Sequence, residues 1–169
     1  MIKNLLAVLF FGLLIMACNS DNSTEPKKDT EFQAGLQDFK DYKSWKKVAT
    51  KFGPDPLLQS AHGANDSLFR NIYFKDDAKA TNGEYETGTI ILKELTDETG
   101  NVVGITVMAK RGGDFNPSGN GWEWFMTDAQ LSQIVTSGDN AQAANGACAG
   151  CHSQANSNNN GVDWVFTRN

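Results

Sequence analysis

The amino-acid sequence predicts an α+β fold in which a small antiparallel β-sheet is flanked by helices. Several short runs rich in β-branched and aromatic residues are separated by turn signals, not by long helices, and this is the pattern of strands paired antiparallel. Segments with helical periodicity precede and follow the main group of these runs. The chain has 169 residues, which is enough for one folded domain.

The N-terminus has the pattern of an export signal. Lys3 supplies a positive charge, and an almost unbroken apolar run from residue 5 to 15 follows it. The run ends in Ile15-Met16-Ala17-Cys18, which resembles the bacterial lipobox. We therefore expect residues 1–17 to be a lipoprotein signal peptide and Cys18 to become the lipidated N-terminus. An uncleaved anchor and an ordinary secretory signal are the alternatives.

The segment after Cys18 is polar and contains few residues that could pack. We interpret residues 18–34 as a flexible tether, and residues 35–169 as the folded domain. The protein is then expected to be an exported bacterial lipoprotein, anchored to a membrane and facing the periplasm or the cell surface. Removing residues 1–17 takes away only Lys3 among the charges, so 15 basic residues become 14 against 20 acidic ones. The negative balance disfavours nucleic acid as a partner.

Each structural element has its own signal in the sequence. A stripe of Phe39, Tyr42 and Trp45 predicts an amphipathic helix over Asp38 to Thr50. Thr127 with Gln130 resembles a capping box and predicts a helix toward Ser137, and a short helix is expected near Ala141 to His152. The predicted strands are Leu68 to Phe74, Thr89 to Leu95, Val102 to Lys110, Trp122 to Met126 and Val162 to Thr167.

The remaining two cysteines carry the strongest functional signal. They lie in Cys148-Ala149-Gly150-Cys151-His152, which is the spacing of a c-type haem attachment motif. Two cysteines three positions apart lie on one side of a helical turn, so their sulfurs can add to the two vinyl groups of a porphyrin, and His152 can ligate the iron. A disulfide, a thioredoxin-like redox pair and a zinc site that also uses His62 are the alternatives.

The order of segments along the chain resembles the cytochrome P-460 family, which includes the beta-type cytochromes c-prime. The matching pieces are His62-Gly63, residues 69–73, residues 88–94, Val107-Met108, residues 121–124, the haem motif and residues 165–168. The resemblance implies a small antiparallel sheet with helices packed on it. It also implies one haem c per chain and a homodimer.

The resemblance gives Lys93 a role. In the hydroxylamine-oxidising members of the family, a lysine at the matching strand position is covalently joined to the porphyrin edge. Strand alternation places Lys93 on the same face as Thr89 and Ile91, opposite Ile90 and Glu94. A lysine whose stem covers apolar surface while its ammonium reaches water is the alternative. Members without the cross-link are reported to bind nitric oxide.

Arg70 matches an arginine that lines the distal pocket in the family. On its predicted strand it shares a face with Leu68 and Ile72, so a guanidinium enters an apolar stripe. Such a donor can stabilise a negatively polarised nitrogen oxide at the iron. The alternative is an ion pair with Asp66, Glu94 or a haem propionate.

The second axial position decides between ligand chemistry and electron transfer. The mature chain offers Met108, Met126 and His62 as strong ligands, and each has a plainer structural explanation. We therefore predict a five-coordinate iron with an open distal site.

Three hypotheses of function follow. The first is an oxidoreductase that acts on hydroxylamine or nitric oxide, with a partner cytochrome for its electrons and with Lys93 and Arg70 at the site. The second is a nitric oxide binding protein without catalysis, and the third is a six-coordinate electron-transfer cytochrome.

Overall fold

The computed structural model describes residues 30–54, 62, 65–157 and 161–169. The predicted signal peptide, Cys18 and most of the predicted tether lie outside these residues. Within the described ranges, no helix is long and apolar enough to cross a membrane.

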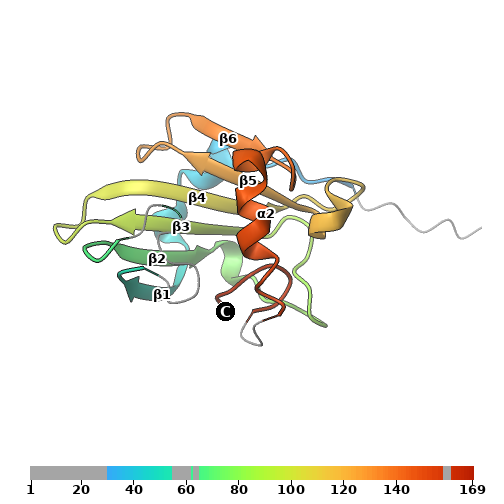
Figure 1. Ribbon diagram of the computed structural model, residues 1–169, viewed down its shortest axis with the longest axis horizontal. Helices are drawn as coiled ribbons and strands as arrows, with labels where there is room; N and C mark the ends of the chain where they lie inside the picture. The colour runs from blue at the N-terminus through green and yellow to red at the C-terminus, as the bar shows by residue number, and fades with distance from the viewer. Residues whose placement is uncertain (1–29, 55–61, 63–64, 158–160) are drawn as a thin grey trace, which may run out of the picture.

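The core of the fold is a six-stranded antiparallel sheet in which each strand pairs with the next one along the chain (Figure 1). The strands are β1 (Lys46–Phe52), β2 (Phe69–Phe74), β3 (Ile90–Thr96), β4 (Val102–Lys110), β5 (Trp122–Thr127) and β6 (Ile134–Gly138). The helices are α1 (Leu36–Phe39) and α2 (Ala147–His152), with single 3-10 turns at Tyr42–Ser44, Lys75–Asp77, Pro117–Gly119 and Ala143–Gly146. This is an α+β fold, and β2 to β5 confirm four of the predicted strands to within one residue at each end.

Two clusters of buried side chains cover the two faces of the sheet. Phe39, Tyr42 and Trp45 from the N-terminal segment pack on one face, against residues such as Leu92 and Phe125. The opposite face carries a second cluster, which includes Ile91, Met108, Trp122, Trp124 and Val165. Helix α2 crosses in front of the sheet in Figure 1, and Cys148 packs against the second cluster.

The predicted helix over Asp38 to Thr50 is wrong beyond Phe39, where α1 ends, and only a single 3-10 turn at Tyr42–Ser44 follows it. The backbone becomes extended at Trp45, and β1 follows as an edge strand paired with β2. The reason is that the apolar side chains of this segment pack on two different faces of the sheet. The stripe that ends at Trp45 packs in the first cluster, whereas Val48 and Ala49 pack against the second, on the other side of the sheet. One face of a single helix cannot reach both sides.

The predicted helix from Thr127 toward Ser137 is also wrong. The Asp128 carboxylate accepts hydrogen bonds from the backbone N–H groups of Ser132 and Gln133, and Leu131 has a φ of 54°, so the chain forms a tight turn here. Three successive β-branched residues then enter β6, which pairs with β5. Thr127 and Gln130 resemble a helix cap in the sequence, but the pairing of β6 with β5 makes this segment a turn and a strand.

The predicted strand over Val162 to Thr167 is instead a tight reversal. Val162 and Val165 exchange two backbone hydrogen bonds of 2.9 Å each, and Asp163 and Trp164 form the turn between them. We call residues 162–165 the C-terminal turn.

Candidate functional site

A cavity that is partly open to solvent lies on the face of the sheet that carries the second cluster. Its lining comes from β1 to β5, from α2 and from the end of the chain. The lining residues include Lys51, His62, Arg70, Ile72, Ile91, Lys93, Thr106, Met108, Trp124, Met126, Cys148, His152, Val165 and Phe166.

Helix α2 carries the cysteine motif and brings two of its three residues to this cavity. Cys148 and His152 line it, and Cys151 lies one helical turn from Cys148. Both thiols are half-buried and neither takes part in a disulfide. Burial raises the pKa of the Cys148 thiol. Both thiols are therefore free to react, and that of Cys148 lies at the cavity itself.

His152 is held in a defined orientation by its surroundings. Its Nδ1 donates a hydrogen bond of 2.8 Å to the carbonyl oxygen of Trp164 in the C-terminal turn. The rings of Trp124 and Phe166 contact the imidazole, with centroids 4.8 Å and 5.6 Å away. Burial lowers the pKa of His152 to about 4, and the charge of Lys93 acts in the same direction. The neutral imidazole therefore uses Nδ1 as a donor, and Nε2 is the nitrogen that could bind a metal.

The sheet contributes three cationic side chains to the same cavity, from Lys51 on β1, Arg70 on β2 and Lys93 on β3. Arg70 on β2 is buried and donates a hydrogen bond of 3.3 Å to the carbonyl oxygen of Pro54. Lys93 on β3 is half-buried and pairs in register with Ile72 of β2 and Thr106 of β4. Arg70, Lys93 and the two residues paired with Lys93 all line the cavity, as strand alternation requires. The structure thus brings Arg70, Lys93, Cys148 and His152 together.

The three candidates for a second axial ligand also reach the cavity. His62, Met108 and Met126 all line it. The His62 ring stacks on that of His152 with a centroid distance of 6.0 Å, and His62 Nδ1 lies 3.3 Å from the hydroxyl of Thr106. Burial holds the pKa of His62 well below its ordinary value, and the nearby charge of Lys93 adds to this effect.

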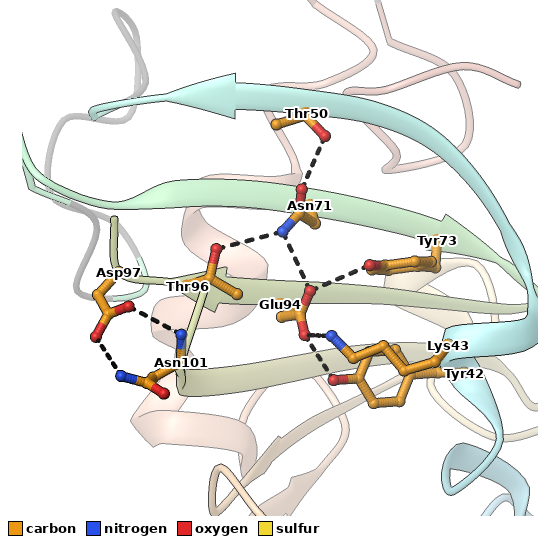
Figure 2. Close-up of polar contacts among 9 residues, drawn as sticks. All are labelled: Tyr42, Lys43, Thr50, Asn71, Tyr73, Glu94, Thr96, Asp97 and Asn101. Carbon is orange, nitrogen blue, oxygen red and sulfur yellow. Dashed lines mark hydrogen bonds and ion pairs between the residues drawn. The ribbon is translucent and has the colours of Figure 1, made fainter. Parts of the chain in front are cut away.

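The carboxylates that the sequence offered as partners of Arg70 lie elsewhere. Asp66 is exposed. Glu94 is buried on the opposite face of the sheet, where it accepts hydrogen bonds from the hydroxyls of Tyr42 and Tyr73 and forms an ion pair with Lys43 (Figure 2). Glu94 therefore belongs to the first cluster and not to the cavity.

Sequence reasoning missed several residues of the site. The carbonyl oxygen of Trp164, which accepts the His152 hydrogen bond, has no side-chain signal that could have revealed it. Lys51 could not be assigned to a strand face, because the segment up to Thr50 is predicted as a helix and not as part of β1. Thr106 could have been found, because it lies two residues before Met108 on the same strand face. Phe166 was assigned to a strand that does not form.

The residues at the cavity fit a haem group. Apolar and aromatic side chains form most of the lining, the free thiol of Cys148 is part of it, and a neutral imidazole is oriented by its own hydrogen bond. Among the described residues, no group of three or more His, Cys, Asp and Glu side chains is arranged to hold a metal ion.

Comparison with known proteins supplies one finding of similarity. The protein-family model described as Cytochrome P460 matches residues 39–167, which is most of the chain. A search among curated proteins finds no significant match.

Proposed function

The chain belongs to the cytochrome P460 family and is therefore a haem-binding cytochrome, and we propose that it carries one covalently attached haem c. Cys148 and Cys151 would hold the group by adding their S–H bonds across its vinyl groups, a reaction that needs no oxidant. His152 Nε2 would ligate the iron, because Nδ1 is already engaged with Trp164. Two free thiols on α2, with that of Cys148 at the cavity, support this assignment.

We further propose that the protein acts on hydroxylamine or nitric oxide as an oxidoreductase. Bound haem supplies a redox-active iron that can take a nitrogen-oxide ligand. The observation that carries the proposal is the convergence of Arg70 and Lys93 on the cavity that also holds Cys148 and His152. The Arg70 guanidinium can donate hydrogen bonds to a negatively polarised N–O group, while the apolar lining excludes water. Oxidation of hydroxylamine to nitric oxide would release three electrons to a partner cytochrome and three protons to solvent.

A nitric oxide binding protein without catalysis is the second candidate, and the charge of the lining favours it. Among the described residues that line the cavity there are three cationic side chains, Lys51, Arg70 and Lys93, and no carboxylate. Oxidation of hydroxylamine requires proton acceptors, whereas binding of nitric oxide does not. The third candidate, an electron-transfer cytochrome, is favoured by the presence of His62, Met108 and Met126 at the cavity.

Lys93 separates the first two candidates. The oxidoreductase hypothesis expects its amine to be bonded to the porphyrin edge. Such a bond replaces one N–H and one C–H, so its formation requires an oxidant, and hydrogen peroxide reduced to water would serve. After proteolysis of the holoprotein, the peptide that contains Lys93 should then remain joined to the haem peptide of Cys148 to His152, and the absorption spectrum should differ from that of ordinary haem c.

Substitution completes this test. Lys93→Ala should restore an ordinary haem c spectrum and abolish hydroxylamine oxidation while nitric oxide binding persists. Lys51→Ala is the matched control, because it removes one cation from the same cavity but should leave the spectrum unchanged. Release of a free Lys93 peptide from a protein with an ordinary spectrum would reject the linked enzyme and leave nitric oxide binding. A low-spin spectrum that becomes high-spin in His62→Ala, Met108→Leu or Met126→Leu would support electron transfer.

The location and the assembly of the protein are further proposals. We infer that Cys18 carries lipid after removal of residues 1–17, so that the haem domain is exported and stays at a membrane. Metabolic labelling with a fatty acid should mark the wild-type protein and not Cys18→Ala. We also infer a homodimer, and light scattering of residues 30–169 should give twice the monomer mass. A clean monomer would reject the dimer.

A further inference from the structure

Asp163, in the C-terminal turn, is the centre of a buried cluster of polar groups. Its side chain is fully buried, and its carboxylate oxygens lie 3.1 Å and 2.8 Å from the ammonium of Lys110. The side chain of Asn120 and the backbone N–H of Tyr85 donate further hydrogen bonds of 2.6 Å and 2.8 Å to the same carboxylate. The indole N–H of Trp122 donates to the Asp163 carbonyl oxygen at 2.8 Å. Asp163 is therefore fixed at both its side chain and its backbone.

The turn that contains Asp163 has an unfavourable backbone conformation. Asp163 and Trp164 have φ angles of 49° and 68°, and Val162 and Val165 exchange two hydrogen bonds across them. A two-residue reversal with both φ angles positive strongly prefers Asn-Gly, because a bulky side chain is disfavoured in the left-handed region. Such a conformation persists only when surrounding contacts over-determine it. The hydrogen bonds to Asp163 are those contacts.

The turn presents one backbone atom to the candidate haem ligand. The carbonyl oxygen of Trp164 accepts the hydrogen bond from His152 Nδ1 at 2.8 Å. The backbone N–H of Trp164 donates to the side chain of Asn156 at 3.1 Å. The position of this carbonyl is thus set by the conformation of Asp163 and Trp164.

We propose that Asp163, together with Lys110, is a positioning residue for His152 and so tunes the haem iron through the Trp164 carbonyl. This inference rests on the proposed function, in which His152 ligates the iron. A hydrogen bond at Nδ1 fixes the orientation of a metal-bound imidazole and increases its electron donation. Electron donation from the axial ligand is one of the few means by which a protein sets the properties of a haem. The buried ion pair between Asp163 and Lys110 would therefore act on the iron indirectly, through the Trp164 carbonyl and His152.

The test compares Asp163→Ala holoprotein with the wild type. The substitution removes every hydrogen bond of the Asp163 carboxylate and its ion pair with Lys110, so the Trp164 carbonyl should move away from His152. We expect the iron–histidine stretching band in the resonance Raman spectrum of the ferrous protein to shift to lower frequency. We also expect the midpoint potential to rise, because a weaker donor stabilises ferric iron less. An unshifted band and potential in folded Asp163→Ala would overturn the proposal.

Glu123→Ala is the matched control for lost stability. Glu123 is also a buried carboxylate with a cationic partner, Arg111 at 3.5 Å, and it lies next to Trp122 and Trp124 on β5. Strand alternation directs it to the opposite face from these two tryptophans, away from the cavity. Its loss should destabilise the fold and leave the band and the potential unchanged. If both variants shift the two readouts equally, Asp163 has only a structural role.

A rescue variant tests the turn itself. Asp163→Asn/Trp164→Gly creates the dipeptide that favours this turn without the ion pair, and Trp164→Gly alone controls for the lost indole. The proposal expects the double variant to return the band toward the wild-type position. If Asp163→Ala does not accumulate, Asn120→Ala and Trp122→Phe each remove one hydrogen bond to Asp163 and should give smaller shifts in the same direction. Absence of any shift in both would overturn the proposal.

Failure of the proposed function has a separate signature. If His152→Ala leaves the haem spectrum of the protein unchanged, His152 is not the ligand and the premise fails. If His152→Ala alters the spectrum while the Asp163 variants do not, only the positioning role fails.

Discussion

Replacement of Glu94 by alanine should be among the most destabilising single changes in the sheet. Glu94 is 1% exposed and lies at the centre of the hydrogen-bond network drawn in Figure 2. Its carboxylate accepts hydrogen bonds from the hydroxyls of Tyr42 at 2.7 Å and Tyr73 at 3.1 Å, and from the Asn71 amide at 3.1 Å. It also forms an ion pair with Lys43. The variant leaves the buried donors without their acceptor.

The expected loss follows from what each partner contributes. A hydrogen bond to a charged group is worth about 1.5–3 kcal/mol, but bonds that share one acceptor do not add. Lys43 is 57% exposed, so its ion pair contributes less than about 1 kcal/mol. Breaking a buried ionic cluster by removing one member costs about 3–5 kcal/mol, and we expect Glu94→Ala to fall in this range. Glu94→Gln keeps the side-chain volume and should cost about 1–2 kcal/mol.

Guanidinium unfolding of the holoprotein, followed by tryptophan fluorescence, measures these losses. Lys43→Ala is the control, because it removes only the exposed partner and should cost less than about 1 kcal/mol. A loss below about 1 kcal/mol in Glu94→Ala, or an equal loss in Lys43→Ala, would refute the reasoning.

The same network predicts a dependence on pH. Burial by itself would raise the pKa of Glu94, but the hydrogen bonds from Lys43 and Tyr42 outweigh burial and hold the pKa below its ordinary value. Burial and the charge of Glu94 in turn raise the pKa of Tyr73 to about 12. A lowered carboxyl pKa stabilises the fold above the ordinary glutamate pKa, and this stability is lost as pH falls through the lowered value. The stability difference between wild type and Glu94→Gln should therefore shrink on acidification. A difference that grows instead would contradict this sign.

Gly161→Ala should destabilise the protein by about 1–3 kcal/mol, because an added Cβ would lie 2.5 Å from the carbonyl oxygen of Ala155. Gly150→Ala, in the exposed helical position with no heavy atom within 4 Å, should be neutral or stabilising by roughly 0.5–1 kcal/mol. Denaturant unfolding measures both, and equal stabilities would contradict the packing of the C-terminal segment. Arg70→Ala should release nitric oxide roughly tenfold faster by stopped-flow absorption, whereas Arg70→Lys keeps part of the effect. An unchanged release rate would show that the Arg70 guanidinium does not interact with bound nitric oxide.

Period-two alternation explains why much of the site could be predicted. It placed Lys93 and Glu94 on opposite faces of their strand and Arg70 on the same face as Ile72, and the structure has them there. Side chains alternate between the two faces wherever a segment forms a strand. The β-branched and aromatic residues of β2 and β3 predict strands clearly. The short spacing of the cysteine motif likewise needs no tertiary information.

The errors arose where tertiary contacts override local preference. Trp45 continues a helical stripe in the sequence, yet β1 follows because the next apolar residues pack on the other side of the sheet. The C-terminal turn has no Gly or Asn to mark it, and it forms because Asp163 is held by Lys110, a residue 53 positions away. Contacts at such separations leave no local pattern, so the orienting carbonyl of Trp164 could not be predicted.

The attachment of haem through Cys148 and Cys151 is the central claim, and the mass of the purified protein under denaturing conditions tests it most directly. Thioether bonds survive denaturation, whereas a haem held only by His152 and by packing does not. Mass spectrometry of the unfolded wild type should therefore give the mass of the chain plus one haem, and Cys148→Ala/Cys151→Ala should give the chain alone. A wild-type protein that loses its haem on denaturation would contradict the account.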